Sequence, residues 1–115
     1  CEESELKELI PILDFIYRLH DTAVRIGLLG IYEEHDPDGM EDRFFRAVLT
    51  LVLDGWSAEN LEKFVSFEIS RSRETGVDLL RKMIIRDGCL SLIKGNTPRD
   101  VKLHFERVFF NRVGK

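Results

Sequence analysis

Apolar residues recur along this chain at steps of three and four residues, which is the spacing of one face of an α-helix. A stripe of that kind is buried when its helix packs against other helices. No segment has the two-residue period of a strand, and the β-branched residues within 47–53 continue a helical stripe from Phe44 and Phe45. We therefore predict an all-α fold, a compact bundle of about five helices. In the first third of the chain the stripe consists of Leu6, Leu9, Ile10, Leu13, Ile16, Tyr17, Val24, Leu28 and Ile31.

Prolines, glycines and short polar runs divide the stripe into helices. Residues 4–34 are expected to form one long helix, or two joined near Pro11, which lacks an amide hydrogen. A turn at residues 35–39 follows. Gly55, Gly76 and Gly95 are expected to end the helices that precede them. These later helices are expected over about residues 40–53, 58–74 and 78–94, with a last one from Pro98 to about residue 111.

One pattern occurs twice, forty residues apart, around Gly55 and around Gly95. In each copy a glycine follows a helix, and a hydroxyl residue stands two positions later, Ser57 or Thr97. Glycine can end a helix because it tolerates positive φ, and the hydroxyl can accept a hydrogen bond from the first turn of the next helix. The pattern predicts two tight helix–helix corners.

The length of 115 residues suits one domain, and residues 1–115 are expected to form a single helical domain. The longest apolar runs, residues 26–32 and 47–53, are far shorter than the ~20 residues required to cross a bilayer. We therefore expect no transmembrane helix and no signal peptide. Two cysteines do not make a disulfide framework and favour a reducing compartment. The alternative is that Cys1, which precedes a polar run, is the lipid-modified first residue of a lipoprotein.

Charge is unevenly divided along the chain. Residues 1–60 carry 14 acidic and 5 basic residues, a net charge of −9, and residues 61–115 carry 7 acidic and 12 basic residues, a net charge of +5. The two halves can attract each other across a bundle or form a polar docking surface. An acidic first half argues against nucleic acid, because phosphates require a concentrated positive field. The basic residues between Arg71 and Arg86 leave one alternative, a regulator that binds DNA through one of the two corners.

Residues 34–39 are the strongest candidate for chemistry, because alternating acidic residues before a sixth-position glycine resemble the start of a calcium loop. The loop fails at its twelfth position, where Phe45 replaces the required glutamate. His20 has no recognisable nucleophile beside it, and Cys89 is expected to be a small core residue. We therefore expect no catalytic residue, no metal site and no cofactor. Trp56 is expected to cover the core, with an exposed anchor for a partner as the alternative.

Two parts of the chain carry motifs that point to one family. Residues 23–31 contain an alanine, a basic residue, a glycine and an apolar run, and residues 83–92 lead into a Gly-Asn-x-Pro-Arg corner at 95–99. Between them lie Phe44-Phe45, Val52-Leu53-Asp54-Gly55 and Glu68-Ile69. In this order the motifs resemble the main cytoplasmic loop and the cytoplasmic tail of motility protein A, the membrane stator subunit of the bacterial flagellar motor. The resemblance covers about residues 15–110.

The resemblance implies a family-like cytoplasmic loop over about residues 15–75, joined directly to a family-like C-terminal tail over about residues 78–112. In the family, two membrane helices lie between these parts, near residues 75–78, and two more precede the first part. Without the intervening helices this polypeptide alone cannot form an ion channel. The implied function is a non-enzymatic protein–protein interaction module that contributes to torque transmission or motor assembly. Its implied location is the cytoplasm, at the inner face of the cell membrane.

The expected partner-binding residues are Glu33, Glu34, Arg43 and Arg46. The family usually has Leu-Glu and then a charged residue implicated in rotor contact, whereas this chain has Ile31-Tyr32-Glu33, with an acidic residue at that position. The expected partner is a protein, either the rotor switch or another flagellar motor component, and not nucleic acid. The chain would contact the membrane only through segments that this sequence lacks or through a partner. Association with further copies of the same chain, as a homo-oligomer, is a second possibility. The alternatives are the DNA-binding regulator and a lipid-anchored helical protein.

Overall fold

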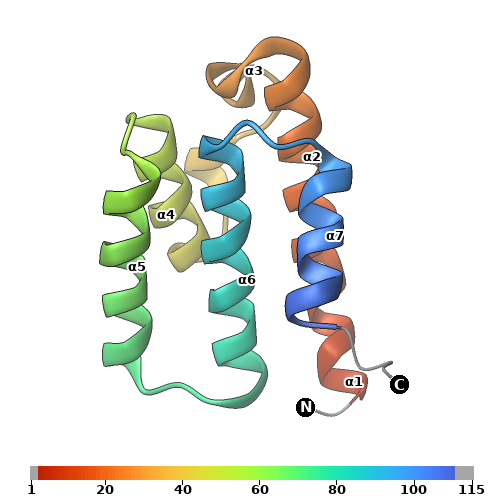
Figure 1. Cartoon of the computed structure of the whole chain (residues 1–115), viewed down its shortest axis with the longest axis vertical. Coiled ribbons are helices and arrows are strands. Elements are labelled where there is room, and N and C mark those ends of the chain that lie inside the picture. The colour runs from red at the N-terminus through yellow and green to blue at the C-terminus, as the bar shows by residue number, and fades with distance from the viewer. Residues whose placement is uncertain (1–2, 111–115) are drawn as a thin grey trace.

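The helices begin and end at residues that cap them or break helical geometry. The structure, a computed structural model that describes residues 3–110, is all-helical over that range, as predicted (Figure 1). Cys1, on which the lipid-anchor alternative depends, lies outside the described residues. In chain order the helices, with η for short 3-10 turns, are α1 (Glu3–Leu6), η1 (Lys7–Leu9), α2 (Ile10–Ile26), η2 (Leu28–Gly30), α3 (Ile31–Glu34), η3 (Pro37–Gly39), α4 (Arg43–Leu53), α5 (Ala58–Ser72), α6 (Gly76–Ile93) and α7 (Pro98–Val108).

The prediction of a continuous helix to residue 34 is wrong at Gly27. Gly27 takes a φ of +89° directly after Ile26, which is the last residue of α2. The chain then turns through η2 and enters the short helix α3, whose first residue, Ile31, is fully buried. The apolar spacing continues across the break because Ile31 still points into the core. Periodicity alone therefore could not reveal the turn.

α4 begins later than predicted, at Arg43. Asp42 caps it, because the Asp42 carboxylate accepts a hydrogen bond from the backbone N–H of Phe45 at 3.0 Å. The other Asp42 oxygen pairs with Arg81 of α6 at 2.5 Å, an ion pair between the acidic and the basic half of the chain. This pair ties the start of α4 to the central helix of the bundle.

The connection between α5 and α6 also differs from its prediction. α5 ends at Ser72, and Arg73 takes the left-handed conformation, with φ +59°. Gly76 does not stop α5; it is the first residue of α6. A non-glycine residue therefore supplies the positive φ, and no sequence signal distinguishes Arg73 from its neighbours.

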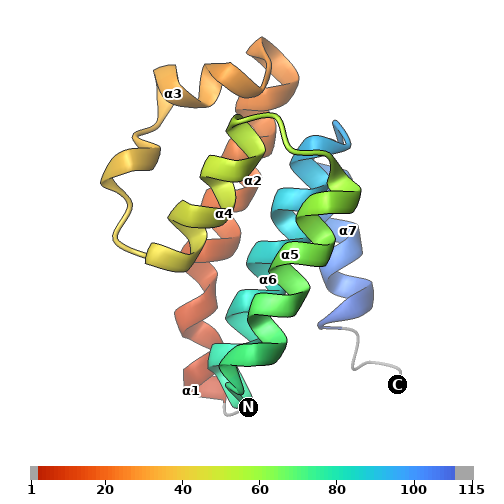
Figure 2. The same ribbon diagram turned by 90° about the vertical axis from the view of Figure 1, so that its left-hand side faces the viewer.

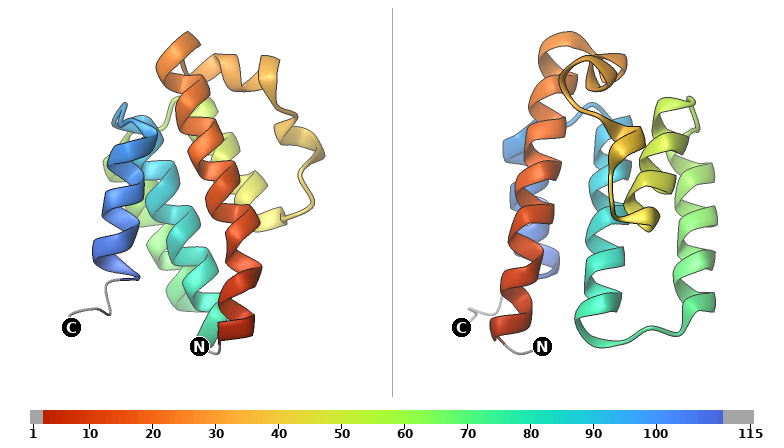
Figure 3. Two further views of the ribbon diagram at one scale, coloured as in Figure 1. Left: turned by 90° about the vertical axis from the view of Figure 1, so that its right-hand side faces the viewer. Right: turned by 180° about the vertical axis from the view of Figure 1, so that it is seen from behind.

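α6 is the central helix. It packs against α2, α4, α5 and α7, and α7 also lies along α2 (Figures 1 and 3). α2 approaches α6 closely at Gly88, where a Cβ would lie 3.0 Å from two carbons of Ile16. The radius of gyration, 13.7 Å, matches the roughly 13 Å of a compact domain of this size. Among residues 3–110, no helix is both long and apolar enough to cross a membrane.

The bundle has two distinct ends. One, here called the link end, carries α1 and the short link of residues 73–75 between α5 and α6 (Figures 1 and 2). The opposite one, here called the corner end, carries α3, the α4–α5 corner at residues 54–57 and the α6–α7 corner at residues 94–97. Surfaces at the same end of the bundle can contact the same partner, whereas surfaces at opposite ends cannot.

The two corners have the same backbone geometry. Gly55 and Gly95 have φ of +95° and +78°, and each amide that follows them reaches back to a carbonyl five residues earlier, at 3.2 Å in both corners. Ser57 then accepts from the amide of Asn60 at 3.1 Å. Thr97 does the same for Asp100 at 3.1 Å, and the Asp100 carboxylate accepts in return from the Thr97 amide at 3.0 Å.

Candidate functional site

The four predicted partner-binding residues do not form one cluster. Glu33 and Glu34 lie in α3 at the corner end, whereas Arg43 and Arg46 lie in the first two turns of α4, which starts away from that end (Figure 2). Arg46 donates to the carbonyl of Met40 at 3.2 Å. Within the part of the chain that the structure describes, no ion pair joins either glutamate to either arginine. A partner could touch all four only by extending along the α3–α4 connection.

Glu34 is held by α2. Arg25 forms a bidentate ion pair with Glu34, in which its two terminal nitrogens lie 2.5 Å and 3.0 Å from the two carboxylate oxygens. The Nε of Arg25 also pairs with Asp21 at 2.9 Å. Thr22 donates its hydroxyl hydrogen to Glu34 at 2.7 Å and contacts the ring of His35 at 3.0 Å. The hydrogen bonds from Arg25 and Thr22 lower the pKa of Glu34 to about 2. These contacts fix α3 across the end of α2.

Beside this polar network lies an exposed apolar surface, here called the α2–α3 patch, formed by Ile26, Leu29 and Tyr32. Leu29 is 65% exposed and Tyr32 48% exposed. The two are three residues apart in consecutive helical turns and so share a face. The side chain of Ile26 lies against Gly30, since a Cβ on that glycine would fall 2.3 Å from Ile26 Cγ1. Exposed Glu33 adds a negative charge next to Tyr32.

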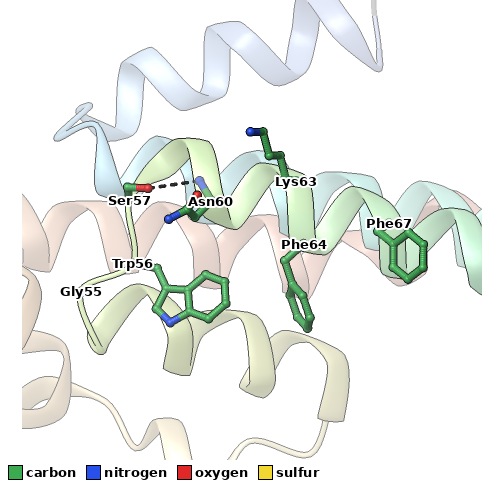
Figure 4. A pocket seen from close by; sticks show the side chains of 7 residues that line it. All are labelled: Gly55, Trp56, Ser57, Asn60, Lys63, Phe64 and Phe67. Atoms are coloured by element: carbon green, nitrogen blue, oxygen red, sulfur yellow. Dashed lines mark hydrogen bonds between the residues drawn. The ribbon is translucent and has the colours of Figure 1, made fainter.

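A second exposed apolar surface, here called the α5 stripe, consists of Trp56, Phe64 and Phe67. They are 37%, 45% and 63% exposed, and the rings of Trp56 and Phe64 meet edge to face with centroids 5.6 Å apart. With Asn60 and Lys63 they line an open groove of about 740 Å³ (Figure 4). The expectation that Trp56 covers the core is wrong: its indole lies on the surface of α5 instead.

His20 and Ser91 form a buried polar contact that joins α2 to α6. The His20 Nδ1 lies 2.8 Å from the Ile16 carbonyl, which can only accept, so Nδ1 carries the hydrogen. The Ser91 hydroxyl then donates to Nε2 at 2.9 Å, and Asn96 donates to the Ser91 oxygen at 3.1 Å. Sequence reasoning missed this pair because 71 residues separate its members and neither stands in a motif.

This contact has the spacing of a serine nucleophile and its base, but its environment favours a structural role. His20 is fully buried, and both ring nitrogens already have partners. An imidazole without exposed surface cannot hand a proton to a leaving group in solvent. Burial also lowers the pKa of His20, which favours the neutral ring. The pair is best described as a polar bridge that sets the position of α2 on α6.

The remaining candidates for chemistry are inert or dispersed. Cys89 is buried in the core, and burial raises the pKa of its thiol far above the usual range. A shallow hollow of about 150 Å³ beside Ser91 is lined by Asp87 and His104, which pair with each other at 2.9 Å. Over residues 3–110, no three His, Cys, Asp or Glu side chains gather in a way that could hold a metal ion.

No protein-family model, no curated protein and no solved structure matches the chain. The similarity to the flagellar stator therefore rests on the motifs in the sequence, and its functional content is a proposal.

Proposed function

We propose that this chain is a non-enzymatic protein–protein interaction module that resembles the cytoplasmic part of a flagellar motor stator and contributes to torque transmission or motor assembly. One observation carries the proposal. Residues 75–78, near which the family has two membrane helices, comprise the last residue of the α5–α6 link and the first residues of α6; they lie at the link end, and α1 lies there too (Figure 1). In the family the other two membrane helices come before this part of the chain. The points at which the family's membrane helices join this part of the chain would thus all lie at the link end.

This polarity assigns roles to the two ends. The link end would face the membrane or a membrane-bound partner, at the cytoplasmic side. The corner end would then point away from the membrane and present the α2–α3 patch to a soluble partner, such as the rotor switch or another flagellar motor component. Exposed Tyr32 is of a residue type enriched among the side chains that dominate protein interfaces, and exposed Leu29 adds apolar surface beside it.

The predicted charged residues have different parts in this proposal. Glu33, exposed beside the patch, would contact the partner directly. Glu34 would act as a positioning residue, because its pairing with Arg25 and Thr22 holds α3 in place. Arg43 and Arg46 would join the interface only with a partner that extends along α4.

The test is a binding titration of the purified chain against purified rotor switch and stator-associated proteins of the same organism, read by biolayer interferometry. Leu29→Glu should weaken the interaction by about tenfold or more, because an exposed apolar anchor becomes charged. Val108→Glu is the matched control, since Val108 is a comparably exposed apolar residue on α7. Absence of binding to every motor component, or binding that Leu29→Glu leaves unchanged, would overturn the proposal.

A further inference from the structure

An open apolar groove lies where α2 passes the start of α4. Ile12 and Phe15 of α2 line it together with Met40 and Phe45. The rings of Phe15 and Phe45 meet edge to face, with centroids 5.6 Å apart, which fixes the shape of the groove. This hollow, here called the α2–α4 groove, has a volume of about 270 Å³, and its other lining residues are Pro11, Glu41 and Asp42.

The size of the groove decides what kind of group can enter it. Pockets for small-molecule ligands usually measure about 300–1,000 Å³ and enclose most of the ligand. The α2–α4 groove is smaller than this range and open to solvent, so it suits one large side chain better than a whole ligand. Its apolar lining favours a side chain that is aliphatic or aromatic.

Unpaired carboxylates lead along the chain to the groove. Residues 33–42 carry six acidic side chains and no lysine or arginine. Ion pairs with Arg25 and Arg81 neutralise two of them, Glu34 and Asp42. The other four follow the α3–α4 connection, which runs down the side of the bundle to the start of α4 (Figure 2). These four are exposed and form no ion pair within residues 3–110: Glu33, Asp36, Asp38 and Glu41.

The α2 side of the groove carries a further carboxylate. Glu8 stands three residues before Pro11 and four before Ile12, so it lies on the side of the helical turn that lines the groove. It is exposed and has no ion pair in the part of the chain that the structure describes. The groove therefore has carboxylates on both of its sides.

The nearby cations do not cancel this charge. Arg18 pairs with Asp14 at 3.0 Å, and Arg46 donates to the Met40 carbonyl at 3.2 Å. Neither these arginines nor Arg43 lines the groove. Five unpaired carboxylates thus stand against two arginines without a carboxylate partner, and the surface keeps a negative field. Such a field repels nucleic acid and anionic lipid and attracts a cationic partner.

We propose that the α2–α4 groove binds a basic segment of a protein partner, which inserts one large apolar side chain into the groove. Lysine or arginine side chains of that segment then lie along Asp36, Asp38 and Glu41. A chain segment can follow carboxylates that are spread along the whole α3–α4 connection, whereas a small cation cannot. The apolar side chain supplies most of the affinity, since exposed ion pairs contribute little, and the charges select the partner.

This surface is separate from the α2–α3 patch, so the inference goes beyond the proposed function and does not depend on it. Its first experiment selects binders of the full chain from a phage-displayed library of random 12-residue peptides. Met40→Gln, which makes the groove lining polar, serves for counter-selection, so that only peptides that need the groove survive. We expect the survivors to carry a net positive charge and a large apolar residue. No survivors, or survivors that are neutral or acidic, overturn the proposal.

The second experiment locates the charges that the peptides recognise. Synthetic copies of the surviving peptides are titrated by fluorescence anisotropy, and circular dichroism confirms that each variant of the chain is folded. Asp38→Lys and Glu41→Lys should each raise the dissociation constant by about tenfold, and added salt should raise it several-fold. Glu106→Lys, the same change of charge on exposed α7, is the matched control and should have little effect.

An equal loss of affinity in Asp38→Lys and Glu106→Lys would show that the peptides respond only to the overall charge, and it would overturn the proposed site. Leu29→Glu, which tests the α2–α3 patch, should leave peptide binding unchanged. Because Leu29→Glu and Met40→Gln affect different surfaces, either proposal can fail without the other.

Discussion

A single buried serine decides whether the ring nitrogen Nε2 of His20 has a hydrogen-bond partner. In Ser91→Ala, Nε2 loses the one donor that it has among residues 3–110, since Asn96 contacts the serine and not the ring. An unsatisfied buried acceptor costs about 1–3 kcal/mol, so the free energy of unfolding should fall by that amount. Urea titration at neutral pH measures it, and exposed Ser70→Ala is the control.

The same bridge can be removed as a pair. His20→Leu combined with Ser91→Ala replaces both partners by apolar groups, so the double variant should be more stable than the sum of the single effects implies. Simple additivity would show that the contact between the ring and the hydroxyl does not contribute to stability.

His20 also makes stability depend on pH. Burial lowers its pKa in the folded chain below the ordinary value near 6.5, so the unfolded chain binds the proton more readily. Stability is therefore fully present above about pH 6.5 and falls as the pH drops below it, with a slope that approaches about 1.4 kcal/mol per pH unit. The pKa of His35 is lowered by burial in the same direction. Glu34, with a pKa of about 2, stays ionised throughout this range.

Urea titrations at pH 7, 6 and 5 measure this slope. His20→Gln, which has no titratable ring, should make the slope shallower at the cost of lower stability at pH 7, while the contribution of His35 remains. A slope that is identical in the parent chain and in His20→Gln would contradict the assignment to His20.

Among the elements, the two corners allow a matched comparison because their backbones are alike and their caps differ. Thr97 takes part in two hydrogen bonds with Asp100, one in each direction, whereas Ser57 accepts one from Asn60. Thr97→Ala removes only the hydroxyl acceptor, because the Thr97 amide still donates to Asp100, so Thr97→Ala and Ser57→Ala should each lower the free energy of unfolding by about 1 kcal/mol. Thr97→Ala combined with Asp100→Ala removes both hydrogen bonds and should lower it by about 1–2 kcal/mol. Urea unfolding of the three variants tests this order, and a loss in the double variant no larger than that in Ser57→Ala would contradict it.

The elements also show where sequence reasoning succeeds. The all-α fold and the placement of Ser57 and Thr97 before their helices follow from local signals, namely helical periodicity and cap chemistry. The break at Gly27 and the end of α5 at Arg73 do not, because both depend on which side of the chain the core occupies. The contact between His20 and Ser91 is equally invisible, since it is created by the packing of α2 on α6. The exposure of Trp56 depends in the same way on the position of α5.

Across the whole molecule, the order of the elements gives the bundle a direction. The chain rises in α2, comes back down between α3 and α4, rises in α4, returns in α5, rises again in α6 and returns in α7. As a result α1 and the link share one end, while both corners and α3 share the other (Figures 1 and 3). The exposed apolar surfaces are placed differently along this axis. The α2–α3 patch, which is proposed to bind a partner, lies at the corner end, and the α5 stripe runs along the side.

This polarity predicts where the chain tolerates additional residues. A flexible insertion of about ten Gly and Ser residues between Glu74 and Thr75 lengthens the link without removing a helical cap. Because the entropy of closing a loop grows only with the logarithm of its length, lengthening the three-residue link in this way should lower the free energy of unfolding by about 1.3 kcal/mol. The same insertion between Gly95 and Asn96 separates Asn96 from the Ser91 carbonyl and hydroxyl and should cost at least twice as much. Thermal and urea unfolding compare the two insertion variants directly. If both variants lose the same free energy of unfolding, the link is as constrained as the corner. That result would count against the link as a place where a pair of membrane helices can be inserted.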